Sequence, residues 1–208
     1  TGVGKTTLAE TMLFESGTIQ KMGTIADGNT VSDFHPMEIE KQKSMYSSVM
    51  SLDWRGYRIN LIDSPGTPDF FGEVVGSLKV AATGVFVINA EFGVEVGTER
   101  LWNYVDGYGT PSIFVVNKVD MPNSNFDQAI EQIKAMAGRE AVVVQYPLDE
   151  GEGFHRIVDV LKMTVYNFSD VGGKPKKEAI PDSEKEKAEL LHNELIEAIA
   201  ENDEGLMD

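Results

Sequence analysis

Cysteine is absent from the 208 residues of this sequence, and basic side chains are few. The lack of cysteine excludes disulfides, zinc–thiolate sites and thiol catalysis within this stretch. Lysine and arginine number 18 against 34 aspartate and glutamate residues, which gives a net charge of −16. This excess of negative charge disfavours electrostatic binding of nucleic acid over a broad surface, because the phosphate backbone is also negative. We therefore expect no direct nucleic-acid patch on this chain.

A long apolar run is also missing, and no basic leader precedes an apolar stretch. These two absences predict neither a membrane span nor a signal peptide, so we expect a cytoplasmic protein with no membrane partner. Hydrophobic residues at 41% and charged residues at 25% are typical of a globular chain. Acidic residues outnumber lysines over residues 172–208, which indicates either a solvated helix face or a docking surface.

What the sequence does contain is an alternation of short apolar strands and helices. This alternation predicts an α/β fold with a mostly parallel sheet and helices on both faces. In such a sheet the ligand lies at the carboxyl ends of the strands. The expected helices cover residues 5–16, 69–82, 98–109 and 125–138, and the expected strands cover 84–90, 111–120, 140–148 and a hairpin over 47–63.

Two segments depart from this alternation. Residues 17–44 lack a clear period, and we expect them to form a long, partly mobile connection. After residue 147 the sequence becomes rich in turns, including Gly172 and Gly173, which predicts a small second unit. That unit ends in a helix in which Ser183 and Glu186 are spaced as a capping box and one face carries Ala188, Leu191, Leu195 and Ala198.

The first functional motif is the glycine-rich start of the chain, TGVGKTTLAE. Gly4, Lys5 and Thr6 fill the last three places of the phosphate-loop pattern G-x-x-x-x-G-K-[ST], whose first glycine would lie before Thr1. Backbone amides of such a loop bind phosphate oxygens, the Lys5 ammonium reaches the outer phosphates, and the Thr6 hydroxyl can ligate Mg²⁺. The alternative is an ordinary loop that enters a helix.

The second motif is DSPG at residues 63–66. Asp63 ends the predicted hairpin, where a carboxylate can hold Mg²⁺ through water, and Gly66 lets a backbone amide approach a terminal phosphate. The same four residues are also good turn formers. Their position, one helix and one hairpin after the phosphate loop, favours the functional interpretation.

The third motif is NKVD at residues 117–120, at the end of a predicted strand. The Asp120 carboxylate can accept two hydrogen bonds from guanine, while Asn117 braces the loop and the stem of Lys118 lies along the base. The pattern is weak by itself, but the three motifs in this order predict a guanine-nucleotide site. If NKVD is accidental, an ATP-using phosphate-loop enzyme is the alternative.

The order of the three motifs resembles that of the translational GTPases. The stretches GVEVGTERLW and FVVNKVDMPNSNFD resemble elongation factor G, and so does RIVDVLKMTVYNF followed by ELLHNELIEAIAENDEGLM. The last pair is similar to the subdomain that is inserted in that family's GTPase domain. The stretches GTIADGNTVSDFHPMEIEKQKS and DSPGTPDFFGEV are more similar to the divergent elongation factor G-like branch.

The resemblance implies a P-loop NTPase domain in two parts. Residues 1–147 would be an incomplete GTP-binding core, and residues 148–208 would be part of a small α+β inserted subdomain. The first strand and the last base-contacting loop would lie outside the chain. GTP or GDP and Mg²⁺ are the implied cofactors, and the full-length parent would be a monomer that acts on the ribosome.

The resemblance also assigns residues to this ligand. Lys5 and Thr67 are the candidate catalytic positions, and Mg²⁺ would be held by Thr6, Ser44 and Asp63. The phosphates and the base would be bound by Gly2, Val3, Gly4, Lys5, Thr6, Thr7, Asp63, Gly66, Asn117, Lys118 and Asp120.

Four positions in or near the first and second switches bear on the expected rate of hydrolysis. The family's first switch usually reads Arg-Gly-Ile-Thr, whereas here Gln42 replaces the flexible glycine and Ser44 keeps a hydroxyl. Thr67 stands where the family usually has a histidine that positions the attacking water, so hydrolysis should be slower while binding remains. His35 is either a substitute for that imidazole or a solvated loop side chain.

We therefore expect the GTP-binding and GTP-hydrolysing domain of a ribosome-associated elongation factor resembling elongation factor G. The γ-phosphate and Mg²⁺ would order the two switches, and hydrolysis would release them. The alternative, which Thr67 and Gln42 favour, is a non-hydrolysing or slow guanine-nucleotide switch that regulates the ribosome.

Overall fold

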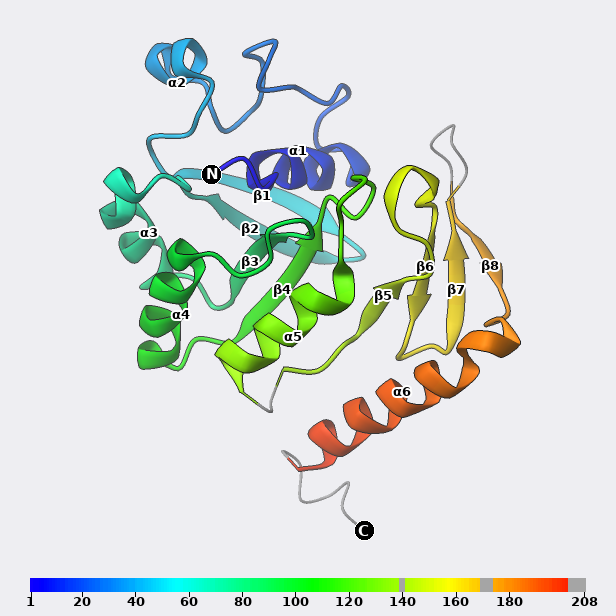
Figure 1. Cartoon of the computed structure of the whole chain (residues 1–208). Helices are drawn as coiled ribbons and strands as arrows, with labels where there is room; N and C mark the ends of the chain where they lie inside the picture. The colour runs from blue at the N-terminus through cyan, green and yellow to red at the C-terminus, as the bar shows by residue number, and fades with distance from the viewer. Residues whose placement is uncertain (139–140, 169–173, 202–208) are drawn as a thin grey trace. The chain divides into compact units, whose positions relative to one another are not determined.

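The computed structural model describes residues 1–138, 141–168 and 174–201. The chain divides into two compact units, one formed by residues 1–87 and 96–115 and the other by residues 88–95 and 116–208 (Figure 1). Each unit is built around its own strands and helices. Within the described ranges, no helix combines the length and the apolar character that crossing a membrane would need.

The first unit begins with the phosphate-loop segment and its helix. Its elements are α1 (Lys5–Glu15), α2 (Pro36–Lys41), β1 (Ser48–Trp54), β2 (Tyr57–Asp63), the 3-10 turn η1 (Pro68–Phe70), α3 (Phe71–Leu78) and α4 (Val96–Tyr108), with most of β3 (Gly84–Asn89) and β4 (Ser112–Asn117). The helices expected over 5–16, 69–82 and 98–109 are therefore confirmed, although α3 is shorter than expected and ends at Leu78. Residues 17–44 were expected to form a connection only, but they contain the short helix α2.

Strands β1 and β2 form the predicted antiparallel hairpin, with Ser48 opposite Asp63 at its open end. Arg55 and Gly56 turn the chain with positive φ angles of 50° and 86°, a conformation that glycine adopts without steric strain. The apolar side chains of one hairpin face pack against helix α1 through Ala9, Leu13, Met50 and Leu52. This packing places the end of β2 beside the start of α1.

Strands β3 and β4 pair with each other and run parallel. The Gly84 amide donates to the Pro111 carbonyl, and further along the Ala90 amide donates to the Asn117 carbonyl, both at 2.8 Å. Donor and acceptor advance together along the chain, which is the pattern of a parallel pair. Helix α4 makes the crossover between them, and its Trp102 ring lies 5.8 Å from Phe86 and 5.4 Å from Phe114, centroid to centroid.

The second unit is a four-stranded antiparallel sheet with two helices. Its elements are α5 (Phe126–Ala137), β5 (Gln145–Pro147), η2 (Gly151–Gly153), β6 (Arg156–Asp159), β7 (Thr164–Asn167), β8 (Lys176–Glu178), η3 (Asp182–Glu184) and α6 (Lys185–Ala200). The strand order is β5-β6-β7-β8. Val158 and Val165 of the sheet and Ala188 and Leu195 of α6 are buried in one core, which fixes α6 on the sheet.

Two expectations about this unit were wrong. The strand expected over 140–148 is limited to β5, and it pairs antiparallel with β6 instead of joining a parallel sheet. The capping box of Ser183 and Glu186 does not form, because the Glu184 amide bonds the Pro181 carbonyl in a 3-10 turn and Glu184 becomes the N-cap of α6. Gly172 and Gly173 lie outside the described residues. The boundary after residue 147 stays a prediction.

Leu195 provides a test of the α6 interface. Leu195 is 5% exposed and Leu190, on the same helix, is 60% exposed. We expect Leu195→Ala to lower the free energy of unfolding by about 2–5 kcal/mol, because the substitution leaves a cavity. Leu190→Ala should change it by less than about 0.5 kcal/mol. Urea unfolding of both variants measures this difference, and equal effects would contradict the packing described above.

Candidate nucleotide and magnesium site

The phosphate-loop segment adopts a conformation that only glycine tolerates well. Gly2 and Gly4 have φ angles of 72° and 98°, and Gly4 is the N-cap of α1. No side chain in the described part of the chain caps this helix end. The amides of the first helical turn are therefore available to an anion, together with the positive end of the helix dipole.

The three predicted magnesium ligands lie together. The Thr6 hydroxyl donates to Oδ2 of Asp63 at 2.7 Å and lies 3.3 Å from the Ser44 hydroxyl. Thr6 comes from α1, Asp63 from the end of β2, and Ser44 from the segment between α2 and β1. Mg²⁺ in nucleotide sites commonly keeps waters and takes one or two carboxylates with phosphate oxygens, and this donor set fits that preference.

Lys5 and Gly66 lie beside this group. Burial lowers the pKa of the Lys5 ammonium, while the charges of Asp63 and Asp33 act to raise it. A Cβ at Gly66 would collide with Nζ of Lys5 and would lie 3.2 Å from the Thr1 nitrogen. Glycine at this position therefore allows the DSPG backbone to lie close to Thr1 and Lys5 of the phosphate-loop segment.

Asp33 belongs to the same group, although no sequence motif identified it. Its side chain is 5% exposed, and among the described residues its Oδ2 has no hydrogen-bond partner; the nearby buried hydroxyl of Ser32 has none either. Burial raises the pKa of Asp33, the Ser44 hydroxyl lowers it, and the charge of Asp63 raises it. An unpaired, buried carboxylate oxygen in this position suits a metal ion or a metal-bound water.

His35 and Gln42, two positions of the first-switch region, lie at the two ends of helix α2. Gln42 is the C-cap of α2 with φ 51° and ψ 42°, the left-handed conformation that a glycine would adopt at lower cost. His35 is the exposed N-cap of α2, where its Nδ1 accepts a 3.4 Å hydrogen bond from the Met37 amide. Its ring also packs against Tyr46 at a centroid distance of 5.3 Å. This histidine therefore has a capping role that the sequence did not reveal.

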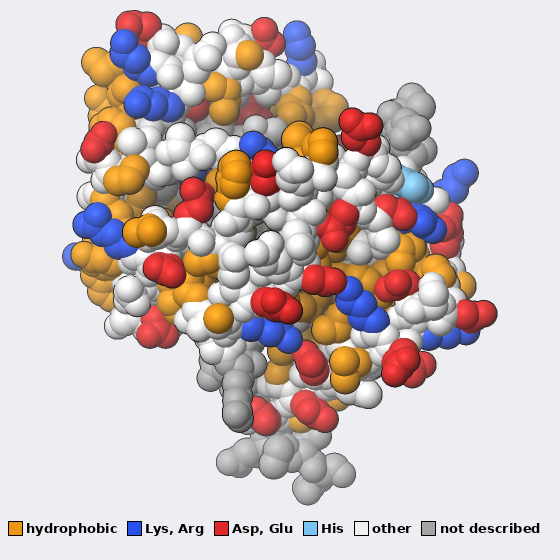
Figure 2. Space-filling model, in the orientation of Figure 1, with side chains coloured by type: hydrophobic (Ala, Val, Ile, Leu, Met, Phe, Trp, Pro, Cys, Tyr) orange, Lys and Arg blue, Asp and Glu red, His pale blue; other side chains and the backbone are white. Residues whose placement is uncertain are grey.

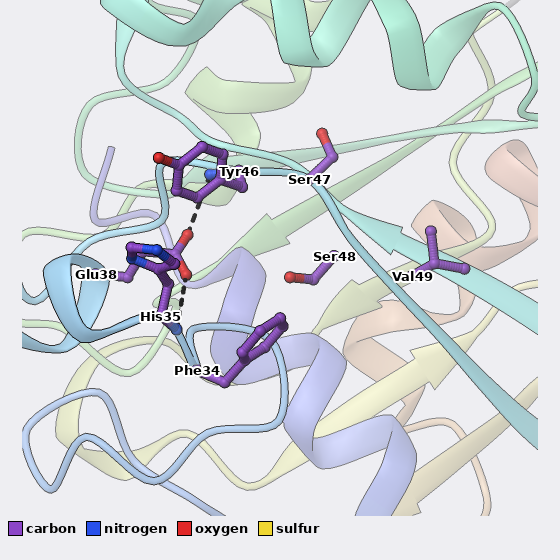
Figure 3. A pocket seen from close by; sticks show the side chains of 7 residues that line it. All are labelled: Phe34, His35, Glu38, Tyr46, Ser47, Ser48 and Val49. Carbon is purple, nitrogen blue, oxygen red and sulfur yellow. Dashed lines mark hydrogen bonds between the residues drawn. The ribbon is translucent and has the colours of Figure 1, made fainter.

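A hollow of about 520 Å³ lies beside His35 (Figure 3). It lies between the start of α2 and the start of β1, and the carboxylate of Glu38, which lines it, accepts a bond from the Tyr46 amide (Figure 3). Its lining consists of Phe34, His35, Glu38, Tyr46, Ser47, Ser48 and Val49.

Three serine hydroxyls connect the segments around Asp63. Ser64 of the DSPG motif donates to Ser77 of α3 at 3.0 Å, Ser77 lies 3.0 Å from Ser47, and Ser47 lies 3.3 Å from Ser64. The Ser47 amide also donates to the Glu73 carboxylate at 2.9 Å. This serine triangle links the first-switch segment, the DSPG motif and α3.

Thr67, the candidate catalytic position, is the N-cap of η1, and its hydroxyl lies 3.4 Å from that of Thr1. The Phe70 amide donates to the Thr67 carbonyl at 3.0 Å, which holds the residue in the turn. No imidazole occupies this position, and His35 makes its bond within α2 instead.

The NKVD motif forms a local turn in the second unit. Asn117 ends β4, Lys118 has a positive φ of 62°, and the Met121 amide bonds the Lys118 carbonyl at 3.2 Å. The Val119 carbonyl accepts two further bonds at 2.8 Å, from the Gly151 amide and the Ser124 hydroxyl. These bonds fix the turn, and the Asp120 side chain is exposed.

The fold and the site define the class of protein. A left-handed glycine loop before α1, a lysine beside it, and a hydroxyl bonded to a strand-end aspartate are the elements of a P-loop NTPase of the α/β class. Residues 1–202 match the model of the elongation factor Tu GTP binding domain. The chain belongs to that family.

Two bacterial elongation factors are similar in sequence to nearly all of this chain. The chain is 37% identical over 207 residues to elongation factor G of Mycoplasma pneumoniae, and 38% identical over 206 residues to elongation factor G 1 of Syntrophomonas wolfei. These matches cover 98% and 99% of this chain but only 30% and 31% of the relatives, so the chain spans less than a third of their length. A crystal structure from Thermus thermophilus matches with a TM-score of 0.91 at 33% identity, covering 99% of this chain and 31% of that one.

The buried carboxylates give a prediction about stability. Burial raises the pKa of Asp33, so at pH 7 its ionised form is less favourable in the folded protein than in the unfolded chain. Without nucleotide or metal, we expect Asp33→Asn to unfold at a higher urea concentration than the wild type at pH 7. The difference between the unfolding midpoints of the two proteins should become smaller as the pH falls toward the raised pKa, because the wild-type carboxyl then takes up a proton.

The exposed Asp106 on α4 gives the matched control, Asp106→Asn. Urea titrations of the three proteins between pH 5 and pH 8 measure the effect. Equal unfolding midpoints for Asp33→Asn and the wild type at pH 7 would contradict the assignment of Asp33 as a destabilising buried charge. A difference in midpoint that becomes larger at low pH would contradict it as well.

Proposed function

We propose that the full-length protein binds GTP and GDP with Mg²⁺ and hydrolyses GTP. The observation that carries this proposal is the convergence of Thr6, Ser44 and Asp63, since these three side chains come from separate parts of the sequence. Phosphates would lie on the amides of residues 2–7, with Lys5 at the outer phosphates and Gly66 at the terminal one. Bound Mg²⁺ would neutralise phosphate charge during transfer.

Asn117, Lys118 and Asp120 would select guanine. The support is the backbone geometry of the NKVD turn, which leaves the Asp120 carboxylate exposed while the Val119 carbonyl fixes the loop. A carboxylate accepts bonds from the two adjacent donors on the guanine edge, whereas adenine presents a different donor and acceptor pattern. This difference separates a GTP-binding protein from an ATP-using one.

The parent protein is proposed to act on the ribosome as a translation elongation factor, as a monomer in the cytoplasm. The names of the relatives from M. pneumoniae and S. wolfei support this role. On the face shown in Figure 2, acidic side chains are spread among the lysines and arginines, so the elements seen there offer no large basic surface for RNA. Contact with ribosomal RNA would then be made elsewhere than on this face.

A slow or non-hydrolysing switch is the second candidate function. Thr67 favours it, because a threonine hydroxyl cannot perform the positioning and proton transfer of an imidazole. Within the chain, residues 1–147 would be the nucleotide-binding core and residues 148–208 the inserted subdomain in either case. The antiparallel sheet β5–β8 with α6 supports a separate subdomain.

Asp120→Asn tests guanine recognition. We expect the affinity for GDP to fall by about 10²-fold, because two bonds to a charged acceptor are lost. Xanthosine diphosphate should bind better to the variant than to the wild type, since its base can donate to the new amide oxygen and accept from the amide nitrogen. Titration of the full-length protein with labelled nucleotides measures both affinities.

The exposed Glu152 supplies a control variant, Glu152→Gln, that should leave both affinities unchanged. ATP should compete poorly in every case. Effective competition by ATP against GDP in the wild type would remove the guanine assignment.

Thr67→His tests hydrolysis. Restoring an imidazole at this position should raise the single-turnover rate of GTP hydrolysis by about 10²-fold. The rates of the wild type and the variant are measured on the full-length protein, with and without ribosomes. Stimulation by ribosomes supports the elongation-factor role, whereas a wild-type rate that ribosomes do not change, together with tight GTP binding, would favour the slow switch.

A further inference from the structure

The position of Ser44 depends on a side chain that does not touch the magnesium group. Ser44 is followed by two residues whose amides both donate to Oε1 of Glu38, Met45 at 2.8 Å and Tyr46 at 3.1 Å. The amide of Lys43, just before Ser44, donates to the Glu38 main-chain carbonyl at 3.2 Å. The backbone on both sides of Ser44 is therefore bonded to Glu38.

The other carboxylate oxygen of Glu38 fixes the start of the same helix. Oε2 accepts a 3.3 Å bond from the His35 amide, as part of the capping box of α2. Glu38 thus joins the first residue of the α2 turn to the segment after the helix (Figure 3). These bonds hold the backbone on both sides of Ser44, whose hydroxyl lies 3.3 Å from that of Thr6.

Glu38 is an unusual residue to serve only as packing. Its side chain is 1% exposed, and its carboxylate is satisfied by backbone amides. Bonds from amides to a carboxylate are stronger than neutral ones, and burying a carboxylate is unfavourable without them. An apolar side chain in the same space would leave these backbone amides without an acceptor, so the carboxylate fixes the backbone around Ser44 in a way that packing alone would not.

We propose that Glu38 is a positioning residue, which holds the Ser44 hydroxyl at the magnesium group and so sets the preference for GTP over GDP. The inference rests on the proposed nucleotide site. A hydroxyl from the first switch contributes to the metal site when the γ-phosphate is present, and is released when it is absent. Loss of Glu38 should therefore weaken binding of the triphosphate more than binding of the diphosphate.

The test is a double-mutant cycle on the full-length protein. Glu38→Ala, Ser44→Ala and the double variant are titrated with GDP and with a non-hydrolysable GTP analogue in the presence of Mg²⁺. Each single substitution should lower the ratio of analogue affinity to GDP affinity by about tenfold, as expected for one bond to a charged group. The double variant should show no further loss, because Glu38 acts through Ser44.

Glu38→Gln keeps one acceptor oxygen, so its ratio of analogue affinity to GDP affinity should lie between those of the wild type and Glu38→Ala. The same variant replaces Glu38→Ala in the test if the alanine variant fails to fold. The neighbouring Glu40, whose side chain is 71% exposed, gives the control Glu40→Gln, which should leave the ratio unchanged.

Two outcomes would overturn the inference. One is a Glu38 variant that unfolds more easily but keeps the wild-type affinity ratio, which would make Glu38 a structural residue only. The other is a double variant whose loss equals the sum of the two single losses. A wild-type protein that binds neither nucleotide would instead overturn the proposed function, so the two failures are distinguishable.

Discussion

The hydrogen bond between the Thr6 hydroxyl and the Asp63 carboxylate is the interaction on which the site depends. It joins the first turn of α1 to the last residue of β2 at 2.7 Å. The hairpin packs on α1 through Leu13 and Leu52. This apolar contact brings the first turn of α1 close to the last residue of β2. Because both partners are buried, water competes little for either group, and the bond orients the hydroxyl and the carboxylate toward a common point.

The same region concentrates negative charge where burial makes it unfavourable. Asp63 and Asp33 both have a raised pKa, chiefly through burial, and Glu38 lies close enough to raise each further. Lys5 is the cation whose charge lowers both pKa values. Such an arrangement is stabilised by added positive charge, so a divalent ion would relieve repulsion that the polypeptide alone retains. The proposed nucleotide and magnesium site is therefore locally unfavourable to stability in the polypeptide alone.

Local spacing was sufficient to predict much of this molecule. The phosphate loop, the hairpin turn at Arg55 and Gly56, and the helical face of Ala188 and Leu195 depend on neighbours a few residues apart, and the structure has them as expected. The contact of Ser44 with Thr6 could be anticipated only because a family pattern relates the two positions. The sequence had no signal for Asp33 or Glu38, because their partners lie in other segments and a single acidic residue in a loop resembles any solvated one. The predicted capping box at Ser183 does not form, because the chain makes a 3-10 turn between Pro181 and Glu184. Glu184 is therefore the N-cap of α6 in place of Ser183.

The serine triangle has a consequence for how the two switch segments separate. Ser47, Ser64 and Ser77 each touch the other two within 3.3 Å. Withdrawing any one hydroxyl removes two of the three contacts and leaves a single pair. Departure of the first-switch segment, which carries Ser47, would thus leave the DSPG motif joined to α3 by the bond from Ser64 to Ser77. Three small side chains, none of them charged, would therefore let the first-switch segment leave while the DSPG motif stays bonded to α3.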